Sequence, residues 1–340
     1  MFQRIKRRGI CLAQYKLFWK TSCIISVVLA LISVGFSFDK IKLEPFSGIY
    51  QTIIGVWPDS LIMIPKLRPG VIVWLIISIS MYLFKEKYYL ISIRSLAPNL
   101  ENIDDKDIQK NFRMQKIDID VSDTIRTQGI KKAIEEIDDK CSCLQRIRGD
   151  QKLGFYGIAH IPFLFRIGYC LGDQSNIQIF HKSREYNSIF MEWASQRGGF
   201  KLQEPEELNF GVTSEELIVA ISTSFEIKTN EIDCLGPHSK HILLFKGNTL
   251  NFDAITSYKD AEEARTRIME KMRELVKAYD IQKIHLVIAS SAAFTFFLGM
   301  AYSRQHDPEC IVYHYERPNY PWGISIKKTA RRCIVRTPLL

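Results

Sequence analysis

Hydroxyl, imidazole, basic and aromatic side chains follow several apolar segments of this chain. Hydroxyl groups and backbone amides can hold phosphates, Lys and Arg neutralise them, and aromatic rings stack on nucleobases. Each side chain alone is also explained as a helix cap, a turn residue or a solvated charge. Because all of these side chains lie near the ends of predicted strands, together they predict a site for a ligand with more than one phosphate. The candidate ligand-binding residues are His160, Phe163, His181, Lys182, Arg184, Ser222, Thr223, Ser224, Lys246, Ser290, Ser291, Thr295, Tyr315, Arg317, Tyr320 and Trp322.

The elements between these residues must position them. Alternating apolar strands and helices favour an open, mostly parallel sheet with helices on both faces. In such sheets ligands lie at the carboxyl ends of the strands, close to helix N-termini whose free N–H groups attract anions. The predicted strands are 153–159, 176–181, 217–223, 241–246, 283–289 and 310–315, and the predicted helices are 161–171, 185–197, 226–235, 257–279 and 291–305.

A stretch near the C-terminus has a looser copy earlier in the chain. Residues 284–320 read IHLVIASSAAFTFFLGMAYSRQHDPECIVYHYERPNY, and residues 154–187 read GFYGIAHIPFLFRIGYCLGDQSNIQIFHKSREYN. The two copies predict two fused Rossmann-like halves that share one site of approximate two-fold character. Chance similarity between two strand–helix–strand segments is the alternative. Equivalent positions are Gly168 and Gly299, Phe163 and Phe294, Phe165 and Phe296, and His181 and His314.

The net charge of +9 lies in the N-terminal segment of the chain. Residues 1–95 carry 13 basic residues (Lys and Arg) against 4 acidic residues (Asp and Glu), whereas residues 96–340 carry 33 basic and 33 acidic residues. The larger part therefore has no excess of positive charge for binding a polymeric nucleic acid. The eight cysteines are scattered, which predicts a reducing compartment and no metal site.

Two apolar runs near the N-terminus predict a transmembrane hairpin. Residues 21–38 contain no charge and would form a helix of about 27 Å, close to the hydrocarbon thickness of a bilayer. Residues 69–84 form a second, slightly shorter run. Six basic residues and no acidic residue in the first 20 positions put both termini in the cytoplasm. A cleaved signal peptide is the alternative for the first run.

Small residues form one stripe along the first apolar run. Such stripes let membrane helices approach closely. Here the stripe either seats the first helix on the second or mediates contacts between chains. The stripe consists of Ser22, Ser26, Ala30, Ser33 and Ser37.

We therefore expect three parts along the chain. Residues 1–95 are the membrane anchor. Residues 96–145 are a linker that contains one short strand near residues 117–121 and a connecting helix that begins at Ser122. Residues 146–340 are an α/β sensor domain.

The C-terminal part resembles the SAVED domain, a sensor built from two fused CARF-like Rossmann halves. The matching segments are KIHLVIASSAAFTFFLGMAY, CIVYHYERPNYPWGISI and ELIVAISTS, and the resemblance extends over about residues 145–330. It implies a sensor with no resident cofactor whose ligand is a cyclic di- or trinucleotide. A cognate nucleotidyltransferase in the CBASS anti-phage system would make this ligand.

Two transmembrane helices before a SAVED domain look like a known effector architecture. The resemblance implies a non-enzymatic, membrane-bound effector that binds the messenger, oligomerises, disrupts the lipid bilayer of the bacterial inner membrane and aborts phage infection. One alternative is an enzyme that cleaves the cyclic nucleotide, with His160, His181 and His314 as acid–base groups. A second alternative is a membrane-anchored receptor that recruits a separate effector.

Overall fold

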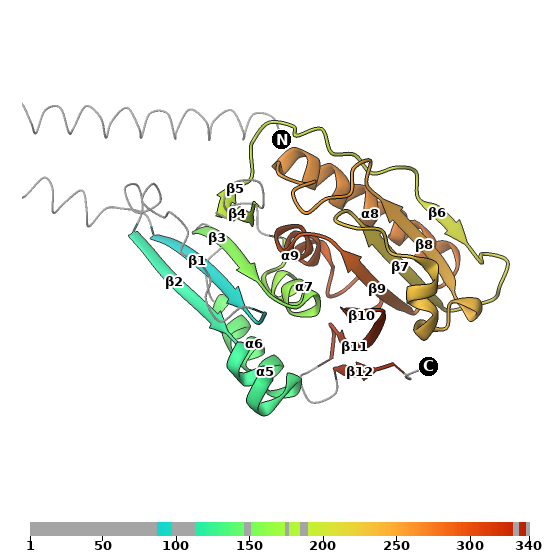
Figure 1. Cartoon of the computed structure of the whole chain (residues 1–340), viewed down its shortest axis with the longest axis horizontal. Coiled ribbons are helices and arrows are strands. Elements are labelled where there is room, and N and C mark those ends of the chain that lie inside the picture. Colours follow the sequence, from blue (N-terminus) through green and yellow to red (C-terminus); the bar gives the residue numbers. More distant parts are fainter. Residues whose placement is uncertain are drawn as a thin grey trace, which may run out of the picture. The chain divides into compact units, whose positions relative to one another are not determined.

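The structure, a computed structural model, describes residues 87–96, 113–145, 151–173, 177–183, 190–328 and 333–337. The chain divides into the units Met1–Lys85 and Glu86–Leu340, and the described elements belong to the second unit (Figure 1). The two predicted membrane helices, the small-residue stripe and Arg184 lie outside the described residues. Within those residues, no helix has the length and apolar character that a membrane span requires.

The first half of the unit is a five-stranded mixed sheet in the order β2-β1-β3-β4-β5. The first four strands are parallel, and β5 runs antiparallel to β4. Its strands are β1 (Lys87–Arg94), β2 (Arg113–Asp120), β3 (Lys152–Ile158), β4 (Ile177–Lys182) and β5 (Phe190–Glu192), and its helices are α5 (Ser122–Gln128), α6 (Ile130–Leu144) and α7 (Ile161–Leu171).

The second half repeats this order as β8-β7-β9-β10-β11, with β6 and β12 added at the two edges. Strands β8, β7, β9 and β10 are parallel, and β11 runs antiparallel to β10. The elements are β6 (Glu206–Leu208), β7 (Glu216–Ser222), β8 (His241–Lys246), β9 (Lys283–Ala289), β10 (Glu309–Glu316), β11 (Asn319–Ser325), β12 (Ile334–Arg336), α8 (Tyr258–Ala278), α9 (Ala292–Ala301) and the 3₁₀ helices η3 (Thr229–Leu235) and η4 (Pro237–Ser239).

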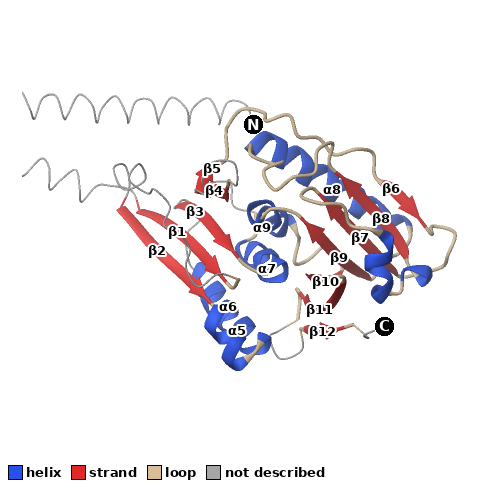
Figure 2. Ribbon diagram, in the orientation of Figure 1, coloured by secondary structure: helices blue, strands red, loops and turns tan. Residues whose placement is uncertain are grey.

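The identical strand order explains the sequence repeat as a structural duplication. Helix α7 connects β3 to β4, and α9 makes the equivalent connection from β9 to β10. Figure 2 shows these two helices side by side between the two sheets. The prediction of two Rossmann-like halves is therefore confirmed. Both sheets are mixed, because β5 in the first sheet and β6 and β11 in the second run antiparallel to the parallel strands beside them.

Helices α7 and α9 approach each other through two equivalent glycines. A Cβ atom on Gly168 would lie 2.1 Å from the carbonyl oxygen of Phe296, and one on Gly299 would lie 2.3 Å from that of Phe165. The contact is reciprocal, as an approximate two-fold relation between the halves requires. A stacked pair of rings, Phe155 and Phe296 with centroids 3.5 Å apart, fills the space beside it.

Each sheet has an inner face that packs in the same core as α7 and α9, and an outer face that does not. Inner-face residues include Ile93 on β1, Ile179 on β4, Ile221 on β7 and Val312 on β10. The outer face of the second sheet packs against η3 through a separate cluster that includes Tyr313. Because strand residues alternate between faces, this division decides which strand-end side chains can meet.

Several predicted boundaries differ from the structure. Residues 87–94, assigned to the anchor, form β1 between β2 and β3, so the α/β unit begins about where the second apolar run ends. The short strand expected near residues 117–121 of the linker is the longer β2, and the helix of that segment breaks into α5 and α6 at Gly129, where φ is +84°. Residues 190–192 of the predicted helix 185–197 form β5. The predicted helix 226–235 is the 3₁₀ helix η3 over 229–235.

Replacing Gly168 with Ala should destabilise the protein by about 2 kcal/mol or more, because the new methyl group would overlap backbone atoms that cannot rotate away. Thermal unfolding of the full-length chain measures the effect. Gly211→Ala is the control, because nothing lies within 4 Å of that site. Equal unfolding temperatures for the two variants would contradict the described contact between α7 and α9.

Candidate functional site

Side chains from the two halves meet at the carboxyl ends of the strands. His160 follows β3 and immediately precedes α7, whereas His314 lies on β10 and Trp322 on β11. The rings of His160 and His314 have centroids 4.5 Å apart, and the Trp322 ring lies 4.9 Å from that of His314. Trp322 also donates a hydrogen bond through Nε1 to Glu316. The sheets therefore direct their carboxyl ends toward a common region.

A second contact between the halves supports this arrangement. Ser183 follows β4 and donates a hydrogen bond of 3.2 Å to Asp253, which lies in the loop after β8. His181, two residues before Ser183, is only 6% exposed. The end of β4 in the first half therefore contacts the loop after β8 in the second.

A hydroxyl group occupies equivalent positions in the two halves. Ser95 follows β1, donates its N–H to the carbonyl of Ile158 at the end of β3, and pairs its hydroxyl with Nδ1 of His160 at 2.6 Å. Thr223 follows β7, donates its N–H to the carbonyl of Ala289 at the end of β9, and bonds the hydroxyl of Ser290 at 2.7 Å. The hydroxyl of Ser95 therefore bonds the residue that precedes α7, and the hydroxyl of Thr223 bonds a residue just before α9.

The helix that follows each of these contacts begins with its N–H groups directed toward the strand ends. Ser291 caps α9 by accepting a hydrogen bond of 3.3 Å from the N–H of Phe294. Pro162 occupies the first turn of α7, where no N–H is needed. Both helix starts favour a negatively charged group nearby.

The imidazoles in this region are neutral near pH 7. Burial, together with the neighbouring His314, lowers the pKa of His160 to about 4. Burial lowers the pKa of His314 to about 4 as well, and it also lowers the pKa of His181. Neutral imidazoles can accept hydrogen bonds from a ligand or take up a proton beside an anion.

The structure brings only part of the predicted set to this region. His160, His181, Thr223, Ser290, Ser291 and Trp322 lie at the inner strand ends or the helix starts. Ser224 lies beside Thr223, and its N–H also bonds the carbonyl of Ala289. Phe163 and Thr295 are fully buried inside α7 and α9, where Phe163 packs on Trp322.

Other predicted residues lie on the outer side. The hydroxyl of Ser222 accepts the N–H of Ile227, Lys246 pairs with Glu226, and Tyr315 donates to Glu231 on η3. Tyr320 is 1% exposed within the outer-face cluster. Lys182 lies two residues after Phe180 on β4 and therefore on the same, outer face of the sheet. Arg317 is exposed in the β10–β11 turn. The structure does not bring these residues to the strand ends on the inner face of either sheet, where α7 and α9 begin.

Two residues of the region were absent from the predicted ligand set. Ser95 was missed because β1 was assigned to the membrane anchor. His314 is among the residues at the end of the predicted strand 310–315, but the ligand set contains its neighbour Tyr315 and not His314. Alternation with the apolar residue Val312 would have placed His314 on the same face as the central helices.

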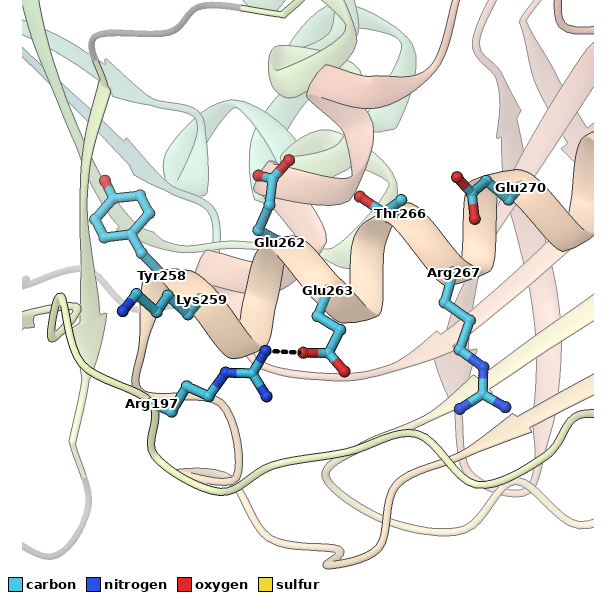
Figure 3. A pocket seen from close by; sticks show the side chains of 8 residues that line it. All are labelled: Arg197, Tyr258, Lys259, Glu262, Glu263, Thr266, Arg267 and Glu270. Atoms are coloured by element: carbon cyan, nitrogen blue, oxygen red, sulfur yellow. Dashed lines mark ion pairs between the residues drawn. The ribbon is translucent and has the colours of Figure 1, made fainter. Parts of the chain in front are cut away.

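A separate open cavity of about 660 Å³ lies along α8 (Figure 3). It is lined by Arg197, Tyr258, Lys259, Glu262, Glu263, Thr266, Arg267 and Glu270, and Arg197 pairs with Glu263 at 2.8 Å. None of the predicted ligand residues lines it. Figure 3 shows side chains of both charge signs spread along α8, with Arg197 on a neighbouring segment, and they do not converge on a point. The strand ends are therefore the better candidate site.

The free energy of unfolding should fall as the pH drops from about 6.5 toward 4, because the unfolded chain binds protons in this window that folded His160 and His314 do not. Each histidine contributes a slope of at most about 1.4 kcal/mol per pH unit. Urea unfolding should show a shallower pH dependence for His314→Asn than for the wild type. The exposed His306→Asn is the control, and equal slopes for all three proteins would contradict the neutral, buried state of His314.

Comparison with solved structures gives several distant likenesses. The Cap4 SAVED/CARF-domain containing receptor of Acinetobacter baumannii, solved with the cyclic trinucleotide 2′3′3′-cAAA, is 17% identical with a TM-score of 0.48, covering 74% of this chain and 54% of that one. The Moraxella osloensis Cap4 receptor is 15% identical with a TM-score of 0.39, covering 67% of this chain and 47% of that one. This chain thus spans about half the length of these receptors.

A search of curated proteins finds no significant match. The family model for the SMODS-associated and fused to various effectors sensor domain, SAVED, matches residues 137–326. The matched range contains both central helices and most of the strand ends described above. This match covers more than half of the chain, which therefore belongs to the SAVED family.

Proposed function

We propose that this protein is a receptor for a cyclic oligonucleotide, which binds where the strand ends of the two halves meet. The contact between His160 and His314 is the observation that carries the proposal, because it joins the halves at the edge where parallel sheets bind ligands. The family is a sensor family, and the Acinetobacter receptor was solved with a cyclic trinucleotide.

The polar groups at this edge suit a ring with several phosphates. The starts of α7 and α9 favour anions, and the hydroxyls of Ser95 and Thr223 can donate hydrogen bonds to phosphate oxygens. Trp322 offers an aromatic surface beside His160 and His314. The duplicated arrangement matches a ligand whose own units repeat.

Ligand binding must change the contact between the halves. Thr223 and Trp322 are buried, and His160 is held between Ser95 and His314. A ligand that reaches these groups therefore separates or rotates the strand ends, and the receptor responds because the ligand prefers that second arrangement.

We also propose that residues 1–85 contain a membrane anchor with helices over about 21–38 and 69–84. Their apolar composition supports this assignment, as does the family description of sensors fused to various effectors. Strand β1 begins at Lys87, three residues after the second apolar run, and ends beside Ser95, which bonds His160. A single strand therefore leads from the candidate ligand site to the proposed membrane segment.

In this proposal an infection-activated nucleotidyltransferase makes the messenger, and the bound receptor oligomerises in the bacterial inner membrane. Assembly would bring the hairpins of several chains together, so that small-residue stripes pack closely and perturb the bilayer. Loss of the membrane barrier would then abort phage infection.

An enzyme that cleaves the cyclic nucleotide is the second candidate, because His160 and His314 form an imidazole pair at the same site. Acid–base cleavage needs a protonated imidazole beside a neutral one near neutral pH, whereas in the ligand-free protein the lowered pKa of both rings keeps both neutral. Linear product from labelled cyclic trinucleotide would favour the enzyme.

Full-length protein should be stabilised against thermal unfolding by a cyclic di- or trinucleotide, by about 2.7 kcal/mol at 100 times the dissociation constant. Thr223→Val should weaken this binding at least about fivefold, since a hydroxyl hydrogen bond contributes roughly 1 kcal/mol. Thr213→Val, in an exposed loop, is the control. If no cyclic di- or trinucleotide raises the unfolding temperature, the receptor proposal is wrong.

Ser22→Leu combined with Ser26→Leu should abolish ligand-dependent dye leakage from vesicles and leave ligand affinity unchanged, because Leu separates helices that small residues allow to pack. The control is Val27→Ile combined with Leu29→Ile, which keeps the same run apolar and leaves the stripe intact. The control should leak as the wild type does. Unchanged leakage from the Ser22→Leu, Ser26→Leu variant would remove the small-residue stripe from the mechanism.

A further inference from the structure

Two histidines occupy equivalent positions in the two halves. His181 lies on β4 and His314 on β10, and each of these strands is the fourth in the strand order that the two halves share. His181 alternates with the inner-face residue Ile179, and His314 alternates with the inner-face residue Val312. The duplication therefore places one imidazole from each half on the inner face, near a strand end.

Both imidazoles have a buried Nδ1 atom without a hydrogen-bond partner among the described residues. Such an atom is costly to leave unsatisfied, so it needs an explanation. The other histidines of low exposure use this atom within the protein: His160 with Ser95, His241 with the carbonyl of Asn209, and His285 with Tyr313.

The charged and titratable groups around the two rings differ. His314 faces His160 and Trp322, and its Nε2 lies 3.9 Å from Glu316. Burial lowers the pKa of His181, and the charge of Asp253 together with a hydrogen bond to the backbone of Met191 partly offsets this effect. Burial lowers the pKa of His314 as well, so both rings are neutral near pH 7 before a ligand binds.

We infer that His181 and His314 are paired ligand contacts, one from each half, and that each takes up a proton when an anionic phosphodiester binds beside it. The inference rests on the proposed function. The protons come from solvent, the phosphodiesters remain anionic, and no covalent bond changes. The two imidazolium–phosphate pairs then satisfy the Nδ1 atoms, which have no hydrogen-bond partner within the described part of the chain.

Proton uptake makes affinity depend on pH. A phosphodiester beside a ring raises the pKa of that ring relative to the free protein. Between the free and the bound pKa, affinity should fall about tenfold per pH unit for each proton taken up as the pH rises. Above the bound pKa the dependence should disappear.

Isothermal titration calorimetry of the full-length chain at about pH 6.5, the ordinary pKa of an imidazole, tests the inference, because burial lowers the pKa of both free rings below that pH. The probes are 2′3′3′-cAAA and 3′3′3′-cAAA together with a panel of cyclic dinucleotides, each titrated in two buffers that differ in ionisation enthalpy. We expect uptake of one to two protons. His181→Asn and His314→Asn should each lower the uptake by about half and weaken binding, whereas the exposed His306→Asn should change neither.

The outcomes separate this inference from the proposed function. Binding without proton uptake, or with uptake unchanged in both variants, contradicts the inference but does not contradict the proposal that the protein is a receptor. Binding of no probe contradicts the receptor proposal itself. If a variant fails to fold, imidazole ¹⁵N NMR of the wild type decides instead. Two of the seven histidines should change from neutral to cationic on binding, and no change would overturn the inference.

Discussion

The close approach of α7 and α9 is the constraint on which the rest of the structure depends. Gly168 and Gly299 each face a backbone carbonyl of the other helix, and no side chain fits between them. This reciprocal contact fixes the relation between the two halves. It also fixes which ends of the two sheets meet, because each helix starts directly after a central strand of its own sheet.

The site that results has approximate, not exact, two-fold character. Ser95 and Thr223 make the same backbone contact in the two halves, but Ser95 holds an imidazole and Thr223 holds a hydroxyl. The two sides of the proposed site therefore present different hydrogen-bonding groups within one framework.

The sequence predicts the α/β fold well, and it predicts part of the set of side chains that the structure brings together at the strand ends. Six strands were placed within a residue or so of their observed ends, because buried parallel strands are apolar runs with clear boundaries. Strand β1 was missed because it follows another apolar run after only a few charged residues, and composition cannot separate the two. The ligand set contains Tyr315 and not His314, because the sequence predicts where the strand ends but not which of its two faces packs on the central helices. That choice depends on tertiary packing.

A structure of the full-length protein with a bound cyclic oligonucleotide tests the central claim most directly. The account predicts a ligand between the halves, with phosphate oxygens within hydrogen-bond distance of Ser95 or Thr223 and of the starts of α7 and α9. A ligand bound on the outer face near Tyr315, or in the cavity along α8, would contradict it.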